Sequence, residues 1–563
     1  MSTTEIKRED IAGVECRFVT YIHPPEPQLP DRHYVKEVLH LKNGQTVRRL
    51  NVIENYKRPF YITKPGYRTY KQRKEWEDVH KLDKFMCRQT DLSQAISAAL
   101  GRPGAKGSYK MAVREPYVYG ADIPSSTLIK RSYRKRFPDF VTPYSVAVLD
   151  TEADMVHGHQ ETIMCSLTMK EKAVIAIQKA SLKGLVNPVP RIHELIDKYL
   201  GEFIKARNIT VEIYVAENEF DVFRHIFQRA HEWQPDFLAI WNMYYDIGKI
   251  INCCRKNGVD PKILFSDPSV PEPYRYFKFQ EGQTQKVSDS GKKQSLDFHR
   301  QWHTVVAPAS FYVIDPMCLY KQIRIGSPEE DSYSLDFMLK KVLKLSKLKF
   351  AEADGYEKGE WHTFMQKFYM LEYAVYNLWD CISVELFDEA TLDMQLSIAA
   401  QAVDSGFDVF NKMPRKIVEY LDDYVKPMGK IMGTTSAEMV DEFNDLTLGV
   451  DGWIVTLSPV PIVDNGIFLF ADAPHVRTRL RKNSGDLDVA GAYPNNGIVL
   501  NQSKETTRKE LCSIEGIHES VFRAQNMNLT GGSTNASQYC REMFGAANYK
   551  QMLDLYRQLH PAE

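Results

Sequence analysis

Acidic residues at the ends of predicted strands constrain this chain more than any other feature of its sequence. Residues 144–150 form an apolar run that ends in Asp150, and Glu152 follows two positions later. Side chains two positions apart on a strand lie on the same face, so these carboxylates should point the same way. Neighbouring carboxylates repel each other unless a cation lies between them, and a hard divalent ion suits that position. Taken alone, the Asp-Thr-Glu triplet is also typical of a surface turn.

Two further segments place an acid beside a buried element. The apolar run 237–241 predicts a strand, and Asp246 follows it in the sequence Asn-Met-Tyr-Tyr-Asp. Tyr376 and Asp380 are four residues apart in a segment with helical periodicity, so they share one helix face. Each acid has an ordinary structural alternative. Asp246 could cap a helix over 247–255, and Asp380 could accept a hydrogen bond from a buried Tyr376.

Length and composition place these acids in a large globular protein. The chain has 563 residues, of which 43% are hydrophobic and 26% charged, and its net charge is −1. Such a length predicts several domains, and the composition excludes a disordered, collagen-like or coiled-coil protein. The balanced charge gives no general attraction to nucleic acid or membrane, but it is compatible with a local basic groove.

The sequence contains no export or membrane signal that we recognise. Its N-terminus is polar, and no segment has about 18 consecutive apolar residues. The 9 cysteines are scattered and include no CxxC pair, so we expect reduced thiols rather than disulfides or a zinc site. We therefore expect a cytoplasmic protein without a membrane partner.

Strand-like and helical segments alternate through residues 141–394. Strands are predicted at 162–168 and 210–215, and helices at 220–233 and 363–389, the last of these long and amphipathic. This alternation predicts an α/β domain.

The flanking regions differ in character from this middle domain. Residues 1–140 contain short β-like runs broken by Pro and Gly, which predicts a β-rich or α+β domain. Residues 395–450 have a helical pattern, and we expect them to return to the first domain. Residues 451–563 form a third region, and the polar stretch 281–294 within the middle domain predicts a surface loop or hairpin.

The acids form an ordered set that resembles the three exonuclease motifs of family B DNA polymerases, in the DEDD superfamily and its tyrosine subtype. The segments 117–124 and 314–320 are similar to the sequences that flank these motifs in the family, and Asp315 falls where the family often has an additional acid. The interval from Asn242 to Asp246 is one residue shorter than is usual there.

The resemblance implies an RNase H-like 3′–5′ exonuclease domain, flanked by the β-rich N-terminal domain and the first part of a polymerase palm with the start of the fingers. It implies two Mg²⁺ or Mn²⁺ ions and substrate contacts at Asn242 and Asp315. Tyr376 would orient the attacking water. The implied catalytic residues of this site are Asp150, Glu152, Asp246, Tyr376 and Asp380, and all of them except Tyr376 would be metal ligands.

A second resemblance lies further along the chain. Residues 487–494 resemble polymerase motif A, with Gly491 and Ala492 in place of the usual Ser and Leu. The resemblance implies a catalytic metal ligand at Asp488 and a contact with the incoming sugar at Tyr493.

Other polymerase motifs are absent from the sequence. It contains neither the Asp-Thr-Asp triplet of motif C nor the Lys-x-x-x-Asn-Ser-x-Tyr-Gly helix of the fingers. Two-metal chemistry needs at least two carboxylates from the protein, so we expect polymerisation only with a second chain that supplies fingers, motif C and thumb. Such split polymerases occur in some bacteriophages, and a truncated gene or protein would give the same sequence.

The expected partners are DNA, as a primer-template and as a single-stranded 3′ end, and this second chain. The basic runs 130–136 and 477–482 could contact phosphates or could be solvated faces. The alternatives are a stand-alone DEDD nuclease or DNA-binding subunit with a vestigial palm, a catalytically silent scaffold, and an RNA-directed nuclease. The intact acids in all three motifs argue against the silent scaffold.

Overall fold

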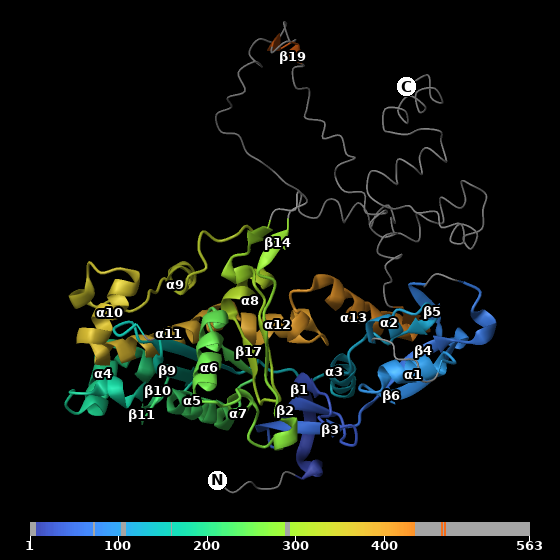
Figure 1. Cartoon of the computed structure of the whole chain (residues 1–563), viewed down its shortest axis with the longest axis horizontal. Coiled ribbons are helices and arrows are strands. Elements are labelled where there is room, and N and C mark those ends of the chain that lie inside the picture. Colours follow the sequence, from blue (N-terminus) through green and yellow to red (C-terminus); the bar gives the residue numbers. More distant parts are fainter. Residues whose placement is uncertain are drawn as a thin grey trace. The chain divides into compact units, whose positions relative to one another are not determined.

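The computed structural model describes residues 7–70, 74–102, 109–158, 160–287 and 293–433, and two short strands, β19 (Val463–Asp464) and β20 (Ile467–Phe468) (Figure 1). The chain divides into two compact units. The first comprises Met1–Phe60, Lys84–Ala105 and Ala121–Gly429, and the second comprises Tyr61–Asp83, Lys106–Gly120 and Lys430–Glu563. Apart from β19 and β20, the predicted palm region 451–563, with Asp488 and Tyr493, lies outside the described residues.

The centre of the first unit is a six-stranded mixed sheet with the order β11-β10-β9-β8-β12-β17. Its strands are β8 (Val146–Ala153), β9 (Thr162–Met169), β10 (Lys172–Gln178), β11 (Thr210–Ala216), β12 (Phe237–Ala239) and β17 (Tyr312–Ile314). β9 pairs antiparallel with β8 and β10, and the other neighbours are parallel. The strands predicted at 162–168, 210–215 and 237–241 are confirmed.

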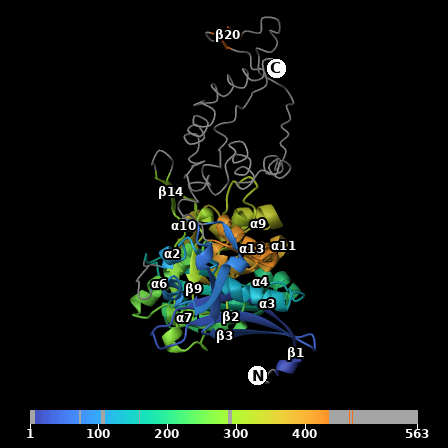
Figure 2. The ribbon, with the colours of Figure 1, turned by 90° about the vertical axis from the view of Figure 1, so that its right-hand side faces the viewer.

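Helices cover both faces of this sheet because its central strands are apolar on both sides. On one face lie α5 (Glu219–Trp233) and α6 (Met243–Lys256), which pack against Leu149, Leu167 and Val174. On the other face lie α4 (Pro188–Ala206) and α11 (Met370–Thr391), which pack against Ile163 and Ile175. Figure 2 shows α6 on one side of β9 and α4 and α11 on the other. The structure is therefore a mixed α/β fold.

The segment 363–389 differs from its prediction as one amphipathic helix. Helix α10 (Lys358–Phe368) ends where the backbone turns at Tyr369, and α11 starts at Met370. Most of α11 is buried on all sides because it packs against the sheet, α4, α9 and α10, so its apolar residues are not confined to one face as in an amphipathic helix.

Shorter helices complete the first unit: α1 (Leu92–Ala99), α3 (Ser125–Arg136), α7 (Lys262–Phe265), α8 (Pro316–Ile323), α9 (Leu335–Leu343), α12 (Ile398–Ala402) and α13 (Met413–Val425). Strands β13 (Lys278–Gln280) and β16 (Thr304–Val306) pair with each other. β14 (Gln285–Val287) pairs antiparallel with β15 (Lys293–Ser295), which is the hairpin of the two alternatives predicted for 281–294.

The first 140 residues are rich in strands, as predicted. β1 (Ile11–Ile22), β2 (Arg32–Leu41) and β3 (Thr46–Glu54) form an antiparallel sheet in the first unit. The chain passes from one unit to the other within β4 (Lys57–Thr63) and back within β6 (Leu82–Arg88).

In the second unit, β4 pairs with β7 (Val118–Tyr119), and β5 (Trp76–Asp78) pairs with β18 (Lys430–Met432); helix α2 (Tyr109–Ala112) precedes β7. The two units do not coincide with the predicted domain boundaries at 140 and 394, which stay predictions.

Candidate metal centre

Three carboxylates from two distant segments of the sequence meet on one face of the central sheet. Asp150 and Glu152 lie on the face of β8 that packs against α11, and Asp380 projects from α11. One ligand oxygen of each carboxylate lies within 4.8 Å of those of the other two. Glu152 and Asp380 are only 8% and 3% exposed, so this is a buried acidic cluster. The prediction that Asp150 and Glu152 share a face is confirmed, and the turn alternative is wrong because both lie within a strand.

Asp246 lies beside this group. Its side chain accepts a hydrogen bond of 2.5 Å from the hydroxyl of Thr151, which lies between the two acids of β8. The alternative that Asp246 caps a helix is wrong, because α6 begins at Met243 and Asn242 is its N-cap. The charge of Asp246 is close enough to contribute to the raised pKa of Asp150.

The predicted tyrosine faces the cluster, and a lysine that the sequence did not reveal accompanies it. Lys347 Nζ donates to the hydroxyl of Tyr376 at 2.9 Å and to Asp380 Oδ2 at 2.6 Å. Lys347 lies in the connection after α9, where several lysines alternate with leucines. No spacing in that segment distinguishes it from its neighbours, so sequence reasoning could not select it.

Two further side chains of α11 bind the acids of β8. Asn377 Nδ2 donates to Asp150 Oδ2 at 2.6 Å, and the Tyr373 hydroxyl donates to Glu152 Oε2. Both residues were missed by the sequence analysis. Tyr373 and Asn377 precede Asp380 by seven and three positions, so all three share one face of the helix, and this spacing could have indicated them.

Burial and mutual repulsion both disfavour the ionised acids. Burial raises the pKa of Asp150 well above its usual range, and the charges of Glu152 and Asp380 add to the effect. Burial is also the largest cause for Glu152, whose pKa is raised to about 8, and for Asp246, whose pKa is raised to about 7. Burial raises the pKa of Asp380 as well, but Lys347 opposes that shift. When all of its acids are ionised, the cluster would thus carry more negative charge than its surroundings neutralise.

The donor set fits a hard divalent cation. The compact group offers only carboxylate oxygens, which are the ligands that Mg²⁺, Mn²⁺ and Ca²⁺ prefer. Asp380 Oδ1 is buried and has no hydrogen-bond partner among the described residues, although a buried carboxylate oxygen is costly unless something binds it. An ion held by Asp150, Glu152 and Asp380 would satisfy this oxygen and relieve the repulsion.

The two predicted substrate contacts have structural roles at the start of α6. Asp315 caps α8 by accepting from the backbone amides of Met317 and Cys318, and it also accepts from the amide of Met243 at 2.9 Å. Asn242 adopts a left-handed backbone conformation, and its backbone N–H donates to Asp315 at 3.3 Å. Asp315 thus links two helix starts, and the substrate contacts of both residues stay predictions.

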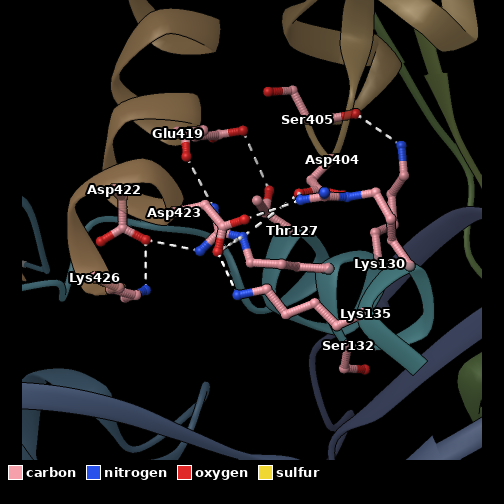
Figure 3. Close-up of polar contacts among 12 residues, drawn as sticks. Thr127, Lys130, Ser132, Lys135, Asp404, Ser405, Glu419, Asp422, Asp423 and Lys426 are labelled. Carbon is pink, nitrogen blue, oxygen red and sulfur yellow. Dashed lines mark hydrogen bonds and ion pairs between the residues drawn. The ribbon is translucent and has the colours of Figure 1, made fainter. Parts of the chain in front are cut away.

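The basic run 130–136 lies on α3, and its Arg131, Arg134 and Lys135 are paired with acids. Figure 3 shows Lys135 beside Asp423, and Lys130 donating to the backbone oxygen of Ser405. Arg131 is paired with Asp422 at 2.8 Å. These contacts favour a structural role over phosphate binding for this run. The run 477–482 lies outside the described residues.

Comparison of the chain with protein-family models and with curated proteins finds no match to either. Among the residues that the structure describes, no helix is both long enough and apolar enough to span a membrane.

Proposed function

We propose that this chain carries a two-metal 3′–5′ exonuclease that acts on single-stranded DNA ends. The observation that supports it most is the convergence of Asp150, Glu152 and Asp380 on one point, with Asp246 and Tyr376 beside them. An all-oxygen ligand set with excess negative charge suits Mg²⁺ or Mn²⁺. The choice of DNA and the 3′–5′ direction come from the resemblance of the motifs to family B DNA polymerases. The mixed sheet covered by helices is compatible with the RNase H-like class, which stays a prediction.

The residues of the site would divide the work of phosphodiester hydrolysis. Bound Mg²⁺ supplies activation of a water and neutralisation of the charge that develops on the phosphate. Asp150, Glu152 and Asp380 would hold the metal, and Asp246 would complete the ligand set. The Tyr376 hydroxyl would orient the attacking water, and Lys347, which donates to that hydroxyl, would fix its direction.

The wider proposal is that the chain is the N-terminal subunit or fragment of a family B DNA-directed DNA polymerase, in the cytoplasm of an infected bacterium if a phage encodes it. Asp488 would supply one ligand of the polymerase metals, and Tyr493 would contact the sugar of the incoming nucleotide. A second chain carrying fingers, motif C and thumb would complete the polymerase. This part rests on the sequence motifs alone.

The test is cleavage of a 5′-labelled single-stranded oligodeoxynucleotide by the full-length chain with Mg²⁺. We expect stepwise shortening from the 3′ end, loss of this activity in Asp150→Ala, and an unchanged circular dichroism spectrum for that variant. Asp197→Ala, which removes an exposed acid on α4, is the matched control and should cleave normally. Equal cleavage by Asp150→Ala and the wild type would refute the nuclease assignment, and faster degradation of RNA would refute the DNA assignment.

A further inference from the structure

Helix α10 fixes the end of β8 immediately after Glu152. Gln366 Nε2 donates to the backbone oxygen of Ala153 at 2.7 Å, and Gln366 Oε1 accepts from the amide of Met155 at 2.8 Å. These two bonds continue the backbone pairing of the strand onto a side chain of α10. The backbone that carries Glu152 is therefore held in place from outside the sheet.

The same face of α10 also reaches the side chain of Glu152 through a tyrosine. His362 precedes Gln366 by four residues, and its Nδ1 lies 2.7 Å from the hydroxyl of Tyr373, which donates to Glu152 Oε2. A phenol has one proton, so Tyr373 cannot donate to both neighbours. His362 Nδ1 therefore carries the proton in that bond, and the contacts form a directed chain from His362 through Tyr373 to Glu152.

We propose that Tyr373, held by His362, is a positioning residue that aims Glu152 at the metal centre. The inference deepens the proposed function and rests on it. Tyr373 occupies Oε2, whereas no hydrogen bond within the described residues reaches Oε1, which is left to bind a cation. A ligand that is already fixed loses little freedom on binding, and partners of this kind raise metal affinity about 10–100-fold.

The first experiment compares Tyr373→Phe with the wild type in the full-length chain. Phenylalanine keeps the ring and removes only the hydroxyl, so the fold should persist. We expect Mn²⁺ affinity, measured by calorimetry without DNA, to fall about 10-fold or more. Exonuclease activity should need correspondingly more Mg²⁺, and most of the maximal rate should return at saturating metal.

A matched control removes a similar bond elsewhere in the same unit. The Tyr214 hydroxyl donates to Asp221 at 3.0 Å, away from the carboxylate cluster. Tyr214→Phe should therefore leave both the Mn²⁺ affinity and the Mg²⁺ dependence unchanged. A loss of metal affinity in this variant would mean that the assay reports general loosening of the fold, and it would overturn the positioning role.

The histidine supplies a rescue test. The amide nitrogen of Asn can replace the Nδ1 donor of histidine, so His362→Asn should keep most of the Mn²⁺ affinity that His362→Ala loses. Equal affinities for the wild type, Tyr373→Phe and His362→Ala would overturn the positioning role while leaving the exonuclease proposal standing. A wild-type chain that binds no Mn²⁺ would overturn both proposals.

Discussion

Two acidic clusters in the first unit have the same number of carboxylates and opposite electrostatics. In the part of the chain that the structure describes, the metal centre places Asp150, Glu152 and Asp380 around one lysine, with Asp246 beside them. His362 adds no charge near neutral pH, because burial and Lys347 lower its pKa to about 4. The second cluster, between α3 and α13, contains the acids Asp404, Glu419, Asp422 and Asp423 (Figure 3). Its cations are Arg131, Arg134, Lys135, Arg415 and Lys426.

The difference shows what a buried acidic cluster does for the protein. Buried carboxylates are tolerated when cations and hydrogen bonds satisfy them. In the α3–α13 cluster Asp422 faces Arg131 at 2.8 Å and Lys426 at 2.6 Å, so a structural role accounts for its burial. In the metal centre the described residues supply too few cations, since Lys347 alone faces Asp150, Glu152 and Asp380 there. The shortage is what a bound metal ion would correct.

The largest expected effect is a loss of stability when an acid is removed from the α3–α13 cluster, whose charges are already paired. Asp422→Asn removes a fully buried charge and leaves Arg131 and Lys426 without it. Breaking a buried ion pair on one side costs about 3–5 kcal/mol, so the free energy of unfolding should fall by that amount in urea titrations. Asp150→Asn, measured in EDTA, should instead be neutral or stabilising because it relieves repulsion. The reverse ranking would show that the two clusters have been assigned the wrong roles.

The second expected effect is that a metal ion stabilises the folded protein by binding at the metal centre and not at the α3–α13 cluster. A ligand present at about 100 times its Kd stabilises the folded state by about 2.7 kcal/mol. Mn²⁺ should therefore raise the thermal midpoint of the wild type and of Asp422→Asn. It should leave the midpoint of Asp150→Asn where it is in EDTA. A midpoint in Asp150→Asn that rises as much as in the wild type would place the ion elsewhere.

The third expected effect is a pH dependence of the metal-free protein. The folded pKa of Glu152 is raised from 4.5 to about 8 by burial and by Asp380, and that of Asp246 is raised from 3.8 to about 7, mainly by burial. At pH values between the unfolded and the folded pKa of each acid, the folded state then binds more protons than the unfolded state. Its stability must therefore fall as pH rises through this window, by about 2 kcal/mol between pH 6 and pH 7.

Urea unfolding in EDTA at the two pH values checks this sign. Glu152→Gln should lose part of the dependence, because its side chain does not titrate. Saturating Mg²⁺ should also reduce the dependence in the wild type, since a bound cation favours the ionised acids. Stability that increases with pH in EDTA would contradict the raised pKa values.

The acids of the site could be predicted from sequence because each lies at a fixed place in a regular element. Asp150 and Glu152 alternate on a strand, and Tyr376 and Asp380 are one helical turn apart, so period alone puts each pair on one face. The order of the motifs predicted that the two pairs meet. The structure confirms this for Asp150, Glu152 and Asp380.

Other features depend on tertiary contacts that no local pattern records. Lys347 lies in an irregular connection, and its role depends on where that connection passes the cluster. Helix α13 reverses the usual pattern, because it buries the charged residues Glu419 and Asp422 and exposes Ile417 and Tyr420. Besides the local Arg415 and Lys426, the cations of α3 pair with this charged face, and they lie almost 300 positions earlier in the chain.

The smallest expected effect concerns Lys347, the cation that contacts the metal centre. Lys347 donates to both Tyr376 and Asp380, and although burial acts against it, the nearby acids raise its pKa, so it is charged at neutral pH. In Lys347→Gln the acids lose the one neutralising charge that the described part of the chain gives them, and Mn²⁺ should bind more tightly in calorimetry. The Tyr376 hydroxyl would lose its fixed direction, so the maximal cleavage rate should fall by about 10-fold, or about 1.4 kcal/mol of activation free energy. Lys347→Gln should thus raise the Mn²⁺ affinity and lower the maximal cleavage rate. Loss of a ligand-positioning residue such as Tyr373 should instead weaken Mn²⁺ binding and spare the maximal rate. Weaker Mn²⁺ binding in Lys347→Gln would mean that the lysine organises the ligands rather than balancing their charge.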